Sequence, residues 1–203
     1  MKQFFLKTTL FLFALLLFNC ENNDPQEQLP PITQTGANTF GAIVDGRAFT
    51  PADSYSTTPG TPKFKGLQTF VGNNFKTSNG DDKWTILTGN FKLNPSIYLY
   101  IYIPSLKDLS TNYIVDTSDG LEDSDLSNAH IYCHINGNNN TYLSTVNSGI
   151  IEFSHLDITN GIYSGTFSVK LKNKDDENGI TDCTSAYFDA TKGCWGNGED
   201  PIV

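Results

Sequence analysis

Apolar and polar residues alternate along most of the chain from Thr39 onward, and turn residues interrupt the alternation at short intervals. Alternation with a period of two places every second side chain on the same face of an extended strand. We predict strands at residues 40–44, 47–49, 67–71, 84–88, 97–103, 113–115, 130–135, 141–144, 150–155, 163–171 and 186–189. Helical periodicity is weak even in its best window, residues 121–128, so the pattern indicates an all-β fold.

Two dipeptides predict tight hairpins between neighbouring strands. Asp45-Gly46 separates the first two strands, and Asn160-Gly161 separates two long alternating segments near the C-terminus. Both pairs tolerate the positive φ angles that two-residue hairpin turns require. Hairpins join antiparallel strands, so we expect residues 38–203 to form one antiparallel domain, either a β-sandwich or a barrel-like sheet.

Composition and charge narrow the classes of function. The chain has 203 residues, with 13 Lys and Arg against 22 Asp and Glu, and a formal charge of −9. Such a chain cannot neutralise a run of phosphates, which excludes nucleic acid as a partner. Nucleophile-elbow, zinc-protease, phosphate-loop and dinucleotide-binding motifs are missing, so we expect no catalytic residue and no cofactor. A glycoside hydrolase needs only two suitably separated carboxylates, and it stays as an alternative.

The N-terminus has the organisation of an export signal. A positively charged start precedes the apolar residues 8–18, a stretch shorter than the ~20 residues of a membrane-spanning helix. The stretch ends in Leu17-Phe18-Asn19-Cys20, which resembles the lipobox of bacterial lipoproteins, with Asn19 in the place of the usual small residue. The resemblance implies that residues 1–19 are a signal peptide and that the thiol of Cys20 carries a diacylglyceryl group.

The residues after Cys20 are expected to form a tether. Residues 20–37 are polar and rich in Pro and Gln, and they lack apolar periodicity. The acidic domain should be repelled by anionic lipid head groups, so the lipid itself is the expected membrane contact. We therefore expect a cell-envelope protein, an outer-membrane lipoprotein on the periplasmic or the surface-exposed side, with a glycan or an envelope protein as its candidate partner.

A further pattern is spread over most of the domain. Its segments are Leu29-Pro30-Pro31, Thr33 to Gly41, Val44-Asp45-Gly46, Gly149 to Phe153, Ser164 to Phe167, Ile180-Thr181-Asp182 and Phe188-Asp189. Together they resemble a family of small Bacteroidota lipoproteins that carry a domain of unknown function. Relatives more often join the last two segments as Thr-Asp-Gly-Arg-Phe-Asp, whereas here Cys183 to Tyr187 stand between them. The resemblance implies a lipid-anchored β domain and assigns no catalytic residue.

Three cysteines remain once Cys20 is assigned to lipid. Cys183 and Cys194 enclose ten residues near the C-terminus, and an exported chain meets an oxidising compartment, so we expect them to form a disulfide. Cys133 would then be a buried free thiol on a strand. The pairings of Cys133 with Cys183 or with Cys194 stay open.

Two other segments contain residue types that bind metals. On a strand, His130 and His134 share a face about 13 Å apart while Cys133 points to the opposite face, so the three cannot hold one ion. The acidic residues of the loop 116–125 lack the spacing of a helix–loop–helix calcium site. We therefore predict a solvated acidic loop and no metal site.

The residues 96–104 (SIYLYIYIP) contain the clearest candidate for ligand binding. Tyr98, Tyr100 and Tyr102 line one face of the strand at about 6.6 Å intervals, a spacing close to that of successive sugar rings. Exposed, this tyrosine row would be a stacking platform for a glycan or another small ligand. Buried, it would be part of a central strand that packs on both faces. We expect the buried arrangement and a structural or accessory role, and the ligand platform stays as the alternative.

Overall fold

The structure is a computed structural model, which describes residues 24–55, 64–76, 82–106, 109, 111–122, 126–136, 140–157, 159–176 and 178–191. Its strands are β1 (Thr39–Val44), β2 (Arg47–Phe49), β3 (Leu67–Lys76), β4 (Asp82–Asn90), β5 (Ile97–Ile103), β6 (Tyr113–Val115), β7 (His130–Ile135), β8 (Asn140–Asp157), β9 (Ile162–Asn173) and β10 (Ile180–Thr191). Within these ranges the one helical element is a single 3₁₀ turn, η1 (Pro25–Gln28). The predicted all-β class is therefore confirmed.

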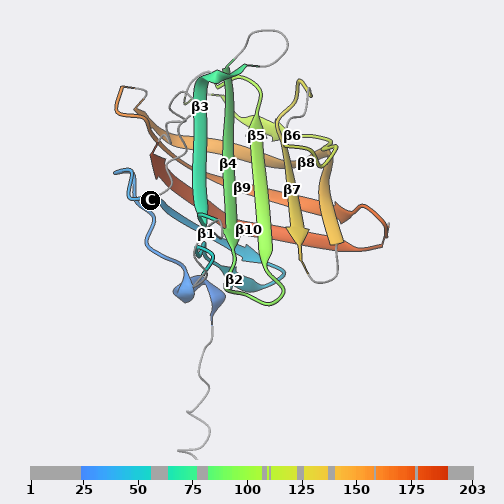
Figure 1. The fold of residues 1–203 in the computed structure, drawn as a ribbon. Helices are drawn as coiled ribbons and strands as arrows, with labels where there is room; N and C mark the ends of the chain where they lie inside the picture. The colour runs from blue at the N-terminus through green and yellow to red at the C-terminus, as the bar shows by residue number, and fades with distance from the viewer. Residues whose placement is uncertain are drawn as a thin grey trace, which may run out of the picture.

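All of these strands belong to one antiparallel sheet. The strand order is β2-β1-β10-β9-β8-β7-β5-β4-β3, with β6 paired to β8. The sheet curls into a half-barrel, so β3, β4, β5 and β7 cross over β8, β9 and β10 (Figure 1). Asp45 and Gly46 both have positive φ at the β1–β2 turn, as the predicted hairpin requires.

The main core fills the space between the two crossing parts of the sheet. Trp84 of β4 is fully buried, and its ring lies 4.9 Å from that of Phe153 on β8 and 5.3 Å from that of Phe188 on β10. These contacts join strands that are far apart in the order of the sheet. Aromatic packing across the inner face therefore holds the sheet in its curled form.

One long strand, β8, replaces two that the sequence predicts. Its first residues pair with β7, its middle residues pair with β6, and β9 lies along its other side. The register with β9 shifts between Ser144 and Gly149, where Asn147 has a φ of 53°. Polar residues at this bulge break the alternation in the sequence, although the backbone continues as one bent strand. The weak helical signal at 121–128 produces no helix in the described residues.

Candidate functional site

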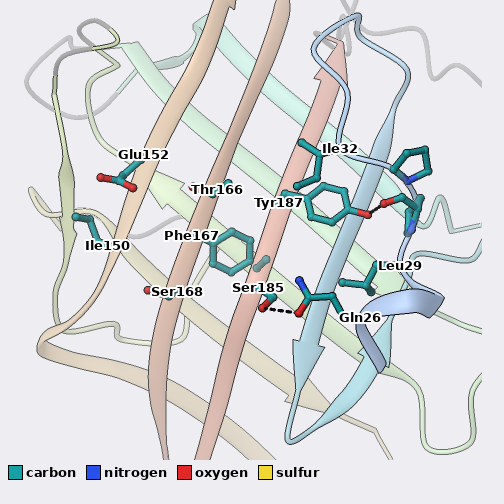
Figure 2. Close-up of a pocket in the computed structure, with 13 residues that line it drawn as sticks. Gln26, Leu29, Ile32, Ile150, Glu152, Thr166, Phe167, Ser168, Ser185 and Tyr187 are labelled. Carbon is teal, nitrogen blue, oxygen red and sulfur yellow. Dashed lines mark hydrogen bonds between the residues drawn. The ribbon is translucent and has the colours of Figure 1, made fainter. Parts of the chain in front are cut away.

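The N-terminal segment 24–37, which the sequence analysis assigns to a flexible tether, lies against the domain. Asp24 caps η1 by accepting a hydrogen bond from the amide of Gln26 at 2.9 Å. Ser185 Oγ of β10 donates to Gln26 Oε1 at 3.4 Å, and the Tyr187 hydroxyl donates to the carbonyl of Pro30 (Figure 2). Residues 24–37 of the expected tether are therefore docked on the outer face of the sheet.

A glycine on β1 makes room for the Tyr187 ring. Gly41 pairs with Tyr187 in the antiparallel register, and a Cβ at residue 41 would come within 2.7 Å of the tyrosine hydroxyl oxygen. Any larger side chain would displace the ring from β1. Gly41 therefore allows Tyr187 to lie over the neighbouring strand and reach the carbonyl of Pro30.

The docked segment ends at a buried carboxylate, which we call the Asp189 clasp. Asp189 is fully buried on β10. It accepts hydrogen bonds from two hydroxyls, one on the docked segment and one on β9, and from three backbone amides of the docked segment. The donors are Thr33 Oγ1 at 2.6 Å, Ser164 Oγ at 2.7 Å, and the amides of Thr35 at 3.0 Å, Gly36 at 2.9 Å and Ala37 at 3.1 Å. The positive φ of Gly36 turns the chain so that successive amides face the carboxylate.

These hydrogen bonds keep Asp189 ionised. Burial is the largest single influence and acts to raise the pKa, but the hydrogen bonds from Thr33, Ser164 and the backbone amides together lower the pKa of Asp189 to about 2. The buried charge is thus compensated by directed donors and needs no basic partner. The clasp has the construction of a structural joint, because every acceptor position faces the protein's own chain.

A second contact joins the start and the end of the domain near the β1–β2 turn. The amide of Asp182 on β10 donates to Asp45 Oδ1 at 3.2 Å, and the amide of Asp45 donates to the carbonyl of Asp182 at 3.1 Å. Two segments of the resemblance therefore meet here, namely Val44-Asp45-Gly46 and Ile180-Thr181-Asp182. In the same way, the segment that contains Thr33 contacts Phe188-Asp189. Several of the segments that carry the resemblance therefore form contacts between the start and the end of the described domain.

The docked segment also forms one wall of an open groove of about 470 Å³. Strands β8, β9 and β10 contribute the floor, with Thr166 and Ser168 of β9 at its centre. Leu29, Pro31 and Ile32 line the wall, and Ile150 and Glu152 of β8 lie on the opposite side (Figure 2). The groove is partly apolar and carries a single carboxylate, that of Glu152.

The tyrosine row is covered rather than open. Tyr100 is 2% and Tyr102 is 0% exposed, and Tyr98 is half-buried. Tyr98 donates a hydrogen bond to Glu122 Oε1 at 2.7 Å, and Tyr100 donates to the carbonyl of Glu122 at 2.6 Å. Burial, and then the hydrogen bond to Glu122, raise the pKa of Tyr98 far above its usual range. This arrangement matches the buried alternative and leaves no stacking surface on Tyr100 or Tyr102.

Other aromatic rings pack around the row on the same face. Tyr132 stacks on Tyr100 with ring centroids 4.9 Å apart, and the His130 ring lies 4.7 Å from that of Tyr102. His130 is fully buried, and burial lowers the pKa of its imidazole. Its Nε2 has no hydrogen-bond partner in the described part of the chain. The row belongs to a small second core outside the main one.

The metal-binding residue types do not converge. His134 contacts Thr141 Oγ1 through Nδ1 at 3.0 Å, whereas His130 is directed into the aromatic cluster. Over the residues that the structure describes, no group of three or more His, Cys, Asp or Glu side chains could hold a metal ion. Part of the acidic loop 116–125 lies outside those residues, and its described members Asp116, Asp119 and Glu122 are not gathered around one point.

Two of the cysteines are buried in the main core and are not bonded to each other. Cys133 on β7 and Cys183 on β10 are each 1% exposed. Burial raises the pKa of Cys133 to about 12, and it raises the pKa of Cys183 as well. Cys194 lies outside the described residues, so the Cys183–Cys194 disulfide stays a prediction.

The expected signal peptide and the lipidation site, Cys20, also lie outside the described residues. No helix in the described ranges is long and apolar enough to cross a membrane. The lipid anchor therefore stays a prediction from the sequence.

Sequence reasoning missed the Asp189 clasp and the groove beside it. One local signal points to the clasp, since Asp189 stands between the buried residues Phe188 and Ala190 of a central strand. A carboxylate at such a position needs hydrogen-bond donors, but nothing in the sequence indicates that they come from residues 33–37. Comparison with known proteins adds no assignment, because no family model, curated protein or solved structure matches the chain.

Proposed function

We propose that the protein is a lipid-anchored, non-catalytic domain of the bacterial cell envelope, held close to its membrane by a docked N-terminal segment. The lipobox-like sequence ending at Cys20 and the resemblance to small Bacteroidota lipoproteins support the anchor. The observation that carries the proposal is the Asp189 clasp, because it fixes residues 33–37 to the last strand of the domain.

The clasp changes how far the domain can move from its anchor. A free tether over residues 20–37 would reach about 60 Å when fully extended. With residues 24–37 docked, the chain from Cys20 to Asp24 spans at most about 14 Å. The domain is then a module that sits near the membrane surface with its η1 end toward the lipid. Such placement suits an accessory component that works beside other envelope proteins.

The lining of the groove supports a non-catalytic role. Glycoside hydrolysis requires two facing carboxylic acids, and Glu152 is the single carboxylate among the residues that line the groove. The hydroxyls of Ser168 and Ser185 have no neighbouring histidine in that lining that could act as a general base.

The second candidate function is a ligand-binding module, and the groove favours it. The tyrosine row gives this candidate little support, because Tyr100 and Tyr102 are buried. The groove is open, and its lining includes Ile32, which is 66% exposed. A binding role would therefore be centred on β8, β9 and β10 rather than on β5.

The anchor is tested by replacing its cysteine. Cys20→Ser should abolish metabolic labelling with a palmitate analogue and release the protein from the membrane fraction. Cys133→Ala is the matched control, because it also removes a thiol and should leave both properties unchanged. Labelling that persists in the Cys20→Ser variant would overturn the proposal.

A further inference from the structure

We propose that the groove between the docked N-terminal segment and β8 binds a short extended peptide that carries a basic side chain between small aliphatic ones. The inference rests on the binding candidate in the proposed function and is independent of lipidation. It follows from the shape of the floor, from the way the sheet already holds one extended segment, and from the charge at the groove's margin.

The floor has the dimensions for one extended chain. The groove reaches from Ile150 and Glu152 on β8 to Ser185 and Tyr187 on β10. Two strand spacings separate β8 from β10, which is about 10 Å. This width accommodates a single strand-like peptide lying flat.

The same face of the sheet already holds an extended segment of this chain. Leu29 has φ −80° and ψ 146°, an extended conformation, and it leads into Pro30 and Pro31 along the wall. Tyr187 donates to the Pro30 carbonyl, so an outward-facing hydroxyl holds a backbone acceptor. Thr166 and Ser168 present further outward hydroxyls one strand away, where a second extended chain would lie.

The groove combines apolar walls with negative charge. The Glu152 side chain is exposed at one margin, and its carboxylate has no hydrogen-bond or ion-pair partner among the described residues. Lys170, the next outward residue after Ser168 on β9, pairs in register with Asp182 and does not line the groove. The ligand that complements this negative charge therefore carries a cationic side chain.

The apolar lining selects aliphatic rather than flat ligands. Leu29, Ile32 and Ile150 supply branched side chains on both sides of the floor. Tyr187 is 3% exposed, so the groove offers no open aromatic ring on which a sugar could stack. A peptide with small aliphatic residues around a lysine contacts both the apolar lining and the carboxylate. An oligosaccharide contacts only the hydroxyls and the carboxylate.

The test measures peptide binding to the full chain purified in detergent, by isothermal titration calorimetry. The probe is a capped hexapeptide with the repeated sequence valine-lysine-valine, and the comparison peptide has glutamate in place of lysine. Glu152→Gln removes the carboxylate, and Asp175→Asn removes one from an exposed turn outside the groove. Ser168→Trp fills the floor from an exposed position and should leave the fold intact.

We expect saturable binding of the lysine peptide and none of the glutamate peptide. Glu152→Gln should weaken binding roughly tenfold, the size of one charge-assisted hydrogen bond, and Asp175→Asn should leave it unchanged. Ser168→Trp should abolish it. Equal binding by the Glu152→Gln and Asp175→Asn variants, or saturable binding of a soluble oligosaccharide instead of the peptide, would overturn the inference. Fatty-acid labelling of Cys20 in the same preparation keeps this outcome separate from failure of the anchor.

Discussion

Thr33 and Asp189 are 156 positions apart in the chain, yet Thr33 Oγ1 donates a 2.6 Å hydrogen bond to Asp189 Oδ2. The contact joins the segment before the first strand to the last strand of the sheet. It belongs to a set of hydrogen bonds that surround one buried carboxylate with donors from the N-terminal segment and from Ser164. The N-terminal segment is therefore part of the folded domain.

Removing the charge of Asp189 should destabilise the domain. Asp189→Asn keeps the shape of the side chain but replaces one acceptor oxygen by a donor amide, which faces the donors of Thr33 or Ser164. We expect a loss of about 3 kcal/mol in the free energy of unfolding, measured by urea denaturation. Asp175→Asn, at an exposed turn, should change it by less than about 0.5 kcal/mol. Equal free energies of unfolding for the two variants would mean that the clasp does not stabilise the domain.

The clasp should also make stability depend on pH in the acid range. The folded-state pKa of Asp189, about 2, lies below the unfolded value of about 3.9, so its contribution is complete above about pH 5. The contribution is lost as the pH falls toward 2, and it amounts to about 3 kcal/mol. Urea midpoints of the wild type and of Asp189→Asn should differ at pH 6 and converge near pH 2. A difference that is the same at both pH values would contradict this assignment.

The tyrosine row should behave as core. Tyr100→Ala removes a buried ring that stacks on Tyr132 and donates to the carbonyl of Glu122, and we expect it to cost about 4 kcal/mol. Tyr55→Ala, at a ring that is 82% exposed, is the control and should cost less than about 0.5 kcal/mol. Thermal and urea unfolding report both values. A folded Tyr100→Ala protein with the stability of the wild type would contradict the assignment of Tyr100 to the core.

The buried thiols should be unreactive in the native protein. Burial raises the pKa of Cys133 to about 12 and also raises that of Cys183, so iodoacetamide at pH 8 should modify neither of them. Peptide mapping after labelling in urea without reductant then tests the pairing. Modification of Cys133 but not of Cys183 would support the predicted Cys183–Cys194 disulfide, and modification of both would contradict it.

The strands could be predicted from the sequence because each has one inner and one outer face. The alternation from Ile97 to Ile103 places isoleucines and leucine in the main core and tyrosines in the second core. The predicted bounds of this strand agree with β5. The alternation fails at residues 145–149, where a bulge makes two segments look separate although β8 runs through both. A period-two pattern cannot show that a backbone continues through a bulge.

The clasp and the groove could not be predicted in this way. Residues 24–37 have the composition of a linker, because they hold few apolar side chains that could report burial. They dock through backbone amides and through one carboxylate that is 152 to 156 positions away. Backbone donors have no signature in a sequence, so the partner of Asp189 becomes visible only once β10 and the N-terminal segment are placed together.

The most direct test of the account is amide hydrogen exchange of residues 33–39 in the full chain, measured by mass spectrometry. We predict that the amides of Thr35, Gly36 and Ala37 are protected to nearly the same extent as those of β10, because they donate to Asp189. In the Asp189→Asn variant this protection should fall while that of β9 persists. Exchange of these amides at the rate of an unstructured peptide in the wild type would contradict the docked segment and the membrane-proximal placement derived from it.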